Sequence, residues 1–245
     1  MFIEPEKIFK YLTPVLQILP SHFESATELL GARSFHFLAD PREVEAQIND
    51  LLMLRNGANV KAKPLLVWEP RPSSCTPANH DAFFQAVQKV DVFTPNHVEL
   101  AASFGHSSPE TVDADVIQAL AIKFLDSGLT IVVRAGERGC FVASGSCSHW
   151  LPPYYEPVGE APKKSSPKIV DPTGAGNAFV GAFTVAFLDT RDMYQAACYG
   201  NVGASFAVEQ IGLPELSGNE EGEAWNDVNP YLRLKEYTSR LKGDC

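Results

Sequence analysis

The feature that most constrains the fold is a repeated alternation of short apolar segments with helical segments. The apolar segments have the length of buried strands and lie at Ser34–Ala39, Pro64–Trp68, Asp91–Thr94 and Thr130–Arg134. Helices are predicted between them, from Asp40 to about Arg55 and at Asp81–Lys89, Asn96–Phe104 and Asp113–Ser127. Apolar strands that alternate with helices indicate a mainly parallel sheet with helices on both faces. The sequence therefore predicts a three-layer α/β/α fold.

The pattern changes after Gly136. Cys140–Ala143 and His149–Tyr155 are typical of an antiparallel β-meander, and a short strand is predicted at Lys168–Val170. Apolar or amphipathic helices are predicted at Ala175–Leu188, Asp192–Gln210 and Tyr231–Leu241. No repeat or linker divides the chain, so we expect residues 1–245 to form one domain.

Composition excludes several classes of function. The net charge of −10 leaves no basic stripe for a nucleic acid. Five cysteines with no C-x-x-C pair indicate neither a disulfide framework nor a zinc site. The acidic start, MFIEPEKIF, is unlike a signal peptide, and no apolar run reaches membrane-spanning length. We expect an intracellular protein without a membrane or nucleic-acid partner, in the cytoplasm or the nucleus.

A glycine-rich turn at Asp171–Gly176, DPTGAG, leads from the strand at Lys168–Val170 into an apolar helix. Backbone N–H groups at the start of a helix can hold a phosphate. A dinucleotide fingerprint fails because Phe179 stands where the third glycine belongs, and a Walker loop fails for lack of Gly-Lys-Ser/Thr. The structural alternative is that the glycines only let the helix pack closely against a strand.

Three weaker motifs accompany this turn. Asn96-His97-Val98-Glu99 follows a predicted strand, although these residues also form a capping box. Arg134–Gly139, RAGERG, has the alternative of a tight turn between two strands. Gly200–Ala204, GNVGA, is a stretch of small residues within a predicted helix.

Together, in this order, the motifs resemble the ribokinase (PfkB) family of carbohydrate kinases. The turn and the helix after it match the family's C-terminal pattern D-T-x-G-A-G-D at Asp171, Thr173, Gly174, Ala175, Gly176, Phe179 and Gly181. The other motifs resemble the family's N-x-x-E, its T-x-G-x-x-G and the small-residue helix beside adenine. The resemblance implies ATP and Mg²⁺ as cofactors and a sugar or nucleoside hydroxyl as phosphoryl acceptor.

The resemblance also assigns roles to individual residues. It implies that Gly174, Ala175 and Gly176 form an anion hole, and that Asn96 and Glu99 organise magnesium through water. The residues expected to contact the nucleotide are Arg134, Gly136, Gly139, Asp171, Thr173 and Asn201.

Three departures from the family pattern modify this expectation. Asn177 stands where the family carries its catalytic aspartate, and a carboxamide cannot accept the substrate proton. Met1 falls where the family is already past its N-terminal lid strands, so we expect either that the protein lacks this lid and substrate half or that the given start is too late. Loss of the lid strands would leave a sheet edge uncovered. Arg134 stands where the family usually has threonine.

Two functions therefore remain open at this point. One is a kinase whose phosphoryl transfer is slow or impaired. The other is a non-catalytic nucleotide-binding relative that acts through a protein partner. The candidate macromolecular partners are a second copy of the chain, in a homodimer, or another protein. A dinucleotide-dependent oxidoreductase is a third and more distant hypothesis.

Overall fold

The structure is a computed structural model, which describes residues 16, 18–108, 111–125, 128–158, 165–218 and 222–241 of the 245-residue chain. Its centre is a six-stranded sheet whose strands are neighbours in sequence order. The strands are β1 (Ser34–Ala39), β2 (Leu65–Pro70), β3 (Val92–Phe93), β4 (Thr130–Arg134), β5 (Cys140–Ser144) and β6 (Cys147–Leu151). Strands β1 to β4 are parallel, and β5 and β6 complete the sheet as antiparallel strands.

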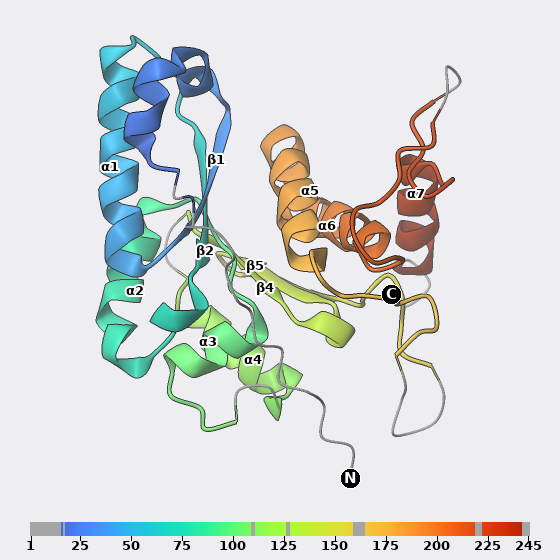
Figure 1. The fold of residues 1–245 in the computed structure, drawn as a ribbon. Coiled ribbons are helices and arrows are strands. Elements are labelled where there is room, and N and C mark those ends of the chain that lie inside the picture. Colours follow the sequence, from blue (N-terminus) through green and yellow to red (C-terminus); the bar gives the residue numbers. More distant parts are fainter. Residues whose placement is uncertain are drawn as a thin grey trace.

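Helices cover both faces of this sheet (Figure 1). One face carries α1 (Pro41–Gly57), α2 (His80–Ala86), α3 (His97–Ser103) and α4 (Ala114–Ile122). The other face carries α5 (Ala175–Thr190), α6 (Met193–Ala207) and α7 (Pro230–Leu241). Short 3₁₀ helices lie at Pro20–Ser25, Thr27–Gly31, Pro72–Ser74, Pro77–Asn79, Val87–Lys89 and Gly136–Arg138. The three-layer architecture and the β-meander after Gly136 are thus confirmed.

Each face of the sheet has its own hydrophobic core. On the α1 side, the Trp68 ring stacks on Phe93 and Phe83, with centroid distances of 4.8 and 5.3 Å. On the α5 side, Phe179 and Phe183 pack with apolar side chains of β5, α6 and α7. The alternate residues of β2 follow this division, because Leu66 and Trp68 join the first core while Leu65 and Val67 join the second.

The small residues of α6 allow this helix to lie close to α5. A Cβ at Gly200 would meet the Phe179 ring at 2.7 Å, and one at Gly203 would meet Ala182 at 2.8 Å. Small side chains at such positions let two helix backbones approach closely. The predicted small-residue segment Gly200–Ala204 therefore serves first in helix packing.

One predicted element is wrong. The structure has no strand at Lys168–Val170, and the N–H groups of Val170 and Asp171 instead donate to the carbonyl of Val208, just after α6, at 2.7 and 3.2 Å. The apolar pattern was misleading because Val170 is 57% exposed and does not belong to the core. Helix α4 is also shorter than predicted, although residues 126–127 lie outside the described part.

Strand β1 forms one edge of the sheet, and within the described residues only β2 pairs with it. The predicted uncovered edge follows from the expected loss of the lid and stays a prediction, because residues 1–15 lie outside the described part of the chain. None of the helices in the described ranges combines the length and the apolar composition needed to cross a bilayer.

Candidate functional site

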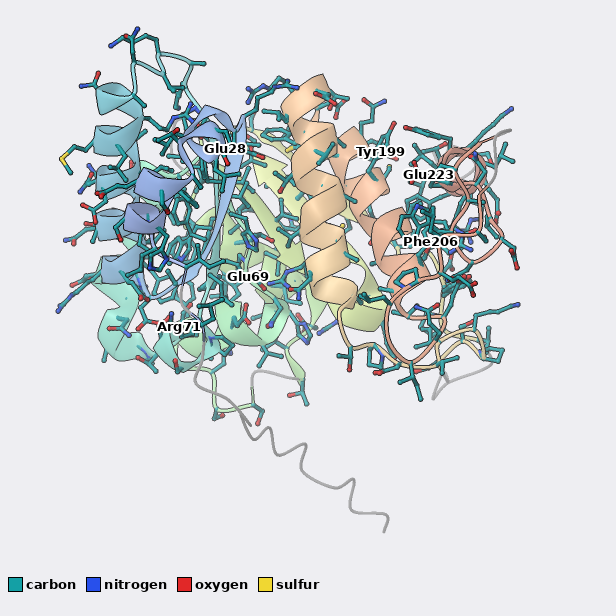
Figure 2. The ribbon with its side chains drawn as sticks, turned by 45° about the horizontal axis from the view of Figure 1, so that its top comes forward. Glu28, Glu69, Arg71, Tyr199, Phe206 and Glu223 are labelled. Atoms are coloured by element: carbon teal, nitrogen blue, oxygen red, sulfur yellow. The ribbon has the colours of Figure 1, made fainter. Side chains whose placement is uncertain are left out.

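A buried cluster of charged side chains lies where β2 and β4 end and α3 begins. Glu69 comes from β2, Glu99 from α3 and Arg134 from the last position of β4. The carboxyl ends of parallel strands meet at one edge of a sheet, which is where α/β proteins usually bind their ligands. Figure 2 shows Glu69 in the interior, between the α1 side of the molecule and α5.

The guanidinium of Arg134 holds this cluster together. Its Nη2 lies 2.7 Å from Glu69 Oε1 and 3.7 Å from Glu99 Oε2, and it donates to the Thr94 carbonyl at 3.0 Å. The side chains of Arg134, Glu69 and Glu99 are 13, 10 and 7% exposed. On the far side of Glu69, His36 Nε2 lies 3.1 Å from Oε2.

The two carboxyl groups respond differently to burial. Burial would raise the pKa of Glu69, but the hydrogen bond from His36 and the charge of Arg134 outweigh it and lower the pKa below the usual value. Burial raises the pKa of Glu99, and the hydrogen bond from the Asn96 backbone and the charge of Arg134 only partly oppose it. Glu69 is therefore the main ionic partner of Arg134.

Asn96 and Glu99 form the capping box of α3. The Asn96 side-chain oxygen accepts the Glu99 N–H at 2.8 Å, and Glu99 Oε2 accepts the Asn96 N–H at 2.8 Å. The structural alternative for this motif is thus present in full. The parallel bridge between Asn96 and Arg134 brings the capping box beside the end of β4.

The glycine-rich turn has the expected conformation at the start of α5. Gly174 is the N-cap residue, with φ at +85°, and the Asp171 carboxylate accepts the Thr173 N–H at 3.0 Å. Gly176 lies in the first turn of the helix, where an added Cβ would come within 2.6 Å of Arg134 Nη1. The guanidinium therefore reaches from the two carboxylates to the N-terminus of α5. Asn177 is exposed on the same turn.

A cavity of about 420 Å³ opens beside this turn. Six of the predicted site residues line it, and they are Arg134, Gly136, Gly139, Ala175, Gly176 and Asn201. The other predicted residues, which do not line the cavity, are Asn96, Glu99, Asp171, Thr173, Gly174 and Asn177. These six residues come from the end of β4, from the connection after it, and from α5 and α6, so distant sequence motifs meet at one place.

Gly139 and Asn201 shape the wall of this cavity. Gly139 has φ at +82°, and a Cβ on it would overlap the Leu151 carbonyl oxygen at 2.0 Å, so this position requires glycine. The Asn201 amide donates to the Tyr237 hydroxyl at 2.8 Å and to the Pro152 carbonyl at 3.3 Å. Its buried amide nitrogen is therefore satisfied within the protein.

Sequence reasoning missed Glu69, His36 and the two aromatic residues Tyr154 and Tyr155 that line the cavity. A usable signal existed for Glu69. A charged residue directly after the apolar run Leu65–Trp68 marks the carboxyl end of a buried strand, where a charge is rare unless it is paired. The tyrosines follow β6 in an irregular segment, where the sequence gives no comparable signal.

The model of the pfkB family carbohydrate kinases matches residues 56–217, well over half of the chain. An uncharacterized protein of Schizosaccharomyces pombe is 32% identical over 94% of this chain and 66% of its own length. Protein MAK32 of Saccharomyces cerevisiae is 30% identical over 95% of this chain and 65% of its own length. The chain thus spans slightly less than two thirds of these relatives.

Solved structures show the same fold. Phosphofructokinase-2 of Escherichia coli, in complex with potassium, has a TM-score of 0.60 at 13% identity, covering 96% of this chain and 66% of that chain. An E. coli protein described as a ribokinase II, in complex with ATP and Mg²⁺, has a TM-score of 0.53 at 20% identity, covering 87% and 61%. With the family match and the order of its motifs, the chain belongs to the pfkB family of carbohydrate kinases.

Proposed function

We propose that the cavity beside α5 binds a nucleotide, ATP in the first place, and that transfer of its terminal phosphoryl group to a sugar or nucleoside hydroxyl is slow. The observation that carries the proposal is the meeting in one cavity of four residues predicted to contact the nucleotide with two residues of the predicted anion hole. Its volume, about 420 Å³, is within the range of small-molecule sites.

The walls of the cavity suit a base, and one end suits phosphates. Phe179, Tyr155 and Ile169 offer apolar and aromatic surface. The first turn of α5, at Ala175 and Gly176, offers the positive end of a helix dipole. A nucleotide has this same division between an apolar base and charged phosphates.

The slow rate follows from Asn177. An amide can orient a substrate hydroxyl but cannot take its proton, and general-base assistance contributes about 10²–10⁴ to a rate. The expected loss is about 3–5 kcal/mol of barrier. Positioning and electrostatic stabilisation, which carry much of phosphoryl transfer, still depend on the turn at Gly174–Gly176.

The residues expected to organise magnesium do not fit that role. The Asn96 side-chain oxygen and Glu99 Oε2 serve the capping box, and the Arg134 guanidinium lies between the carboxylates and Gly176. Mg²⁺ requires several oxygen ligands in near-octahedral geometry. Within the described ranges, no three His, Cys, Asp or Glu side chains are grouped to hold an ion.

A non-catalytic nucleotide-binding protein that acts through a protein partner is the second candidate. The neutral Asn177 and the position of Arg134 both favour it over an efficient kinase. The release of ADP with a panel of sugars and nucleosides distinguishes the two functions. Turnover that depends on an acceptor supports the kinase, whereas nucleotide binding without turnover supports the second candidate.

Thermal unfolding with and without ATP tests the binding site. A ligand present at a hundredfold excess over its Kd stabilises a protein by about 2.7 kcal/mol. We expect a clear rise in Tm, which Gly176→Val abolishes because a side chain there displaces Arg134. Gly181→Val is the matched control, since Gly181 lies in the same helix with open space around it. An unchanged Tm at millimolar ATP would refute the proposed function.

A further inference from the structure

The side chain of Arg134 lies between two buried carboxyl groups and the N-terminus of α5. One end of its guanidinium is 2.7 Å from Glu69 and 3.7 Å from Glu99. The other end faces Gly176, in the first turn of α5. Arg134 also lines the cavity described above. A fixed cation thus lies between a carboxylate cluster and the expected phosphate end of the cavity.

The hydrogen-bonding capacity of Arg134 is only partly used. A guanidinium carries five N–H donors in a planar fork that matches two oxygens of a phosphate. The contacts to Glu69 and Thr94 both use Nη2. Nε–H is buried and has no acceptor among the described residues. A buried donor without a partner is costly. Nη1 is the guanidinium nitrogen beside Gly176, which lines the cavity, so it is the donor that an oxygen-rich ligand in the cavity would approach.

The negative charge of Glu69 and Glu99 means that a polyphosphate can bind near these residues only if a cation is present. Without Arg134, Glu69 and Glu99 would oppose the approach of a polyphosphate to α5. When Arg134 is present, it neutralises Glu69 in a close ion pair, and the side of its guanidinium that faces Gly176 attracts an anion. A Mg²⁺ ion placed here would meet a like charge, and both oxygens of Glu69 and Oε2 of Glu99 would already be engaged.

We propose that Arg134 is the resident cation of this site and takes the place of the divalent metal, so that nucleotide phosphates bind without Mg²⁺. This inference rests on the proposed function, because it concerns how the same cavity holds a nucleotide. It makes Arg134 a residue that determines the metal requirement of binding. The family's threonine at this position could not do so, since threonine carries no charge.

The test is calorimetric titration of the full chain with ATP, in excess EDTA and in excess MgCl₂. We expect the two Kd values to agree within about threefold, because the resident cation already supplies the positive charge. A Kd more than about tenfold tighter with Mg²⁺ would overturn the inference while leaving the proposed function intact. No binding under either condition would refute the proposed function and the inference together.

Two variants extend the test. Arg134→Lys keeps the charge but not the fork, so binding in EDTA should weaken while remaining independent of Mg²⁺. Arg134→Thr combined with Glu69→Gln removes the cation and the carboxylate that needs it, which protects the fold. Binding of this double variant in EDTA should fall at least about tenfold, and unchanged binding would overturn the inference. Circular dichroism of each variant confirms folding before titration.

Discussion

Removal of the Arg134 guanidinium should destabilise the fold, and the structure sets the size of the effect. Arg134→Met keeps the length of the side chain but leaves Glu69, 10% exposed, without its ion pair at 2.7 Å. The loss of one partner of a buried ion pair costs about 3–5 kcal/mol. We expect the lower end of this range, because His36 remains 3.1 Å from Glu69. Urea unfolding measures this difference in the free energy of unfolding.

A double-mutant cycle shows whether the cost comes from the pair. In Arg134→Met combined with Glu69→Gln, no unpaired charge remains at position 69, so the two changes together should cost less than their sum by about 2 kcal/mol. Free energies that add within about 0.5 kcal/mol would refute the ion pair as the source of the effect.

The dependence on pH provides an independent check. With Arg134 present, the pKa of Glu69 is lowered, so its contribution to stability is present above its unfolded pKa of about 4.5 and is lost as the pH falls below it. Without Arg134, only the hydrogen bond and the charge of His36 oppose the effect of burial, so the pKa of Glu69 rises above its value in the unmodified protein. Arg134→Met should therefore cost more at about pH 8 than at about pH 5. A cost that grows toward acid would contradict this reasoning.

Three further predictions concern other parts of the site and the fold. Asn177→Asp should raise the rate of phosphoryl transfer by about 10²-fold or more without changing the Kd for ATP, and an unchanged rate with a broad acceptor panel would show that the missing base is not limiting. Gly139→Ala should destabilise the fold by about 3 kcal/mol or more, because the added Cβ would lie 2.0 Å from the Leu151 carbonyl oxygen and the backbone would also be strained. The control Gly145→Ala, with φ at +57° and open space for the Cβ, should lower the free energy of unfolding in urea by only about 1 kcal/mol. Among the described cysteines, only the exposed Cys147 should react rapidly with N-ethylmaleimide, as measured by peptide mass spectrometry. Burial raises the thiol pKa to about 12 in Cys75, Cys140 and Cys198, so these thiols should react slowly. Rapid labelling of any of these three would mean that the hydrophobic core around it is accessible to solvent.

The elements that could be predicted are those whose signals are local. Ser34–Ala39 and Thr130–Arg134 are apolar runs with clear boundaries, and the structure has strands with the same limits. The helix after Asp40 begins where its capping box predicts. Lys168–Val170 failed because its apolar residues meet the end of α6 and solvent rather than a neighbouring strand. Whether a short apolar segment becomes a strand is therefore decided by its neighbours in the tertiary structure.

The candidate site was predictable to a similar extent. The spacing of particular residues in the sequence indicates the glycine turn at Gly174–Gly176 and the motifs at Asn96 and Arg134, because the backbone geometry requires those residue types there. The sequence does not indicate the ion pair between Arg134 and Glu69. The two residues are far apart in sequence and meet only because β2 and β4 end at one edge of the sheet. The sequence shows an arginine in place of threonine but not the carboxylates that hold it.

The ion pair between Arg134 and Glu69 limits which single substitutions the fold tolerates. Arg134 and Glu69 depend on each other, because either alone would be a buried charge without its main partner. A return to the family's threonine at position 134 would therefore require Glu69 to change at the same time, or the fold would lose stability. Asn177 is exposed at the start of α5, outside this buried network, so an aspartate can be introduced there alone. Position 177 and the proposed resident cation Arg134 are thus separable by mutation, and their effects on turnover and on the metal requirement of binding can be measured one at a time.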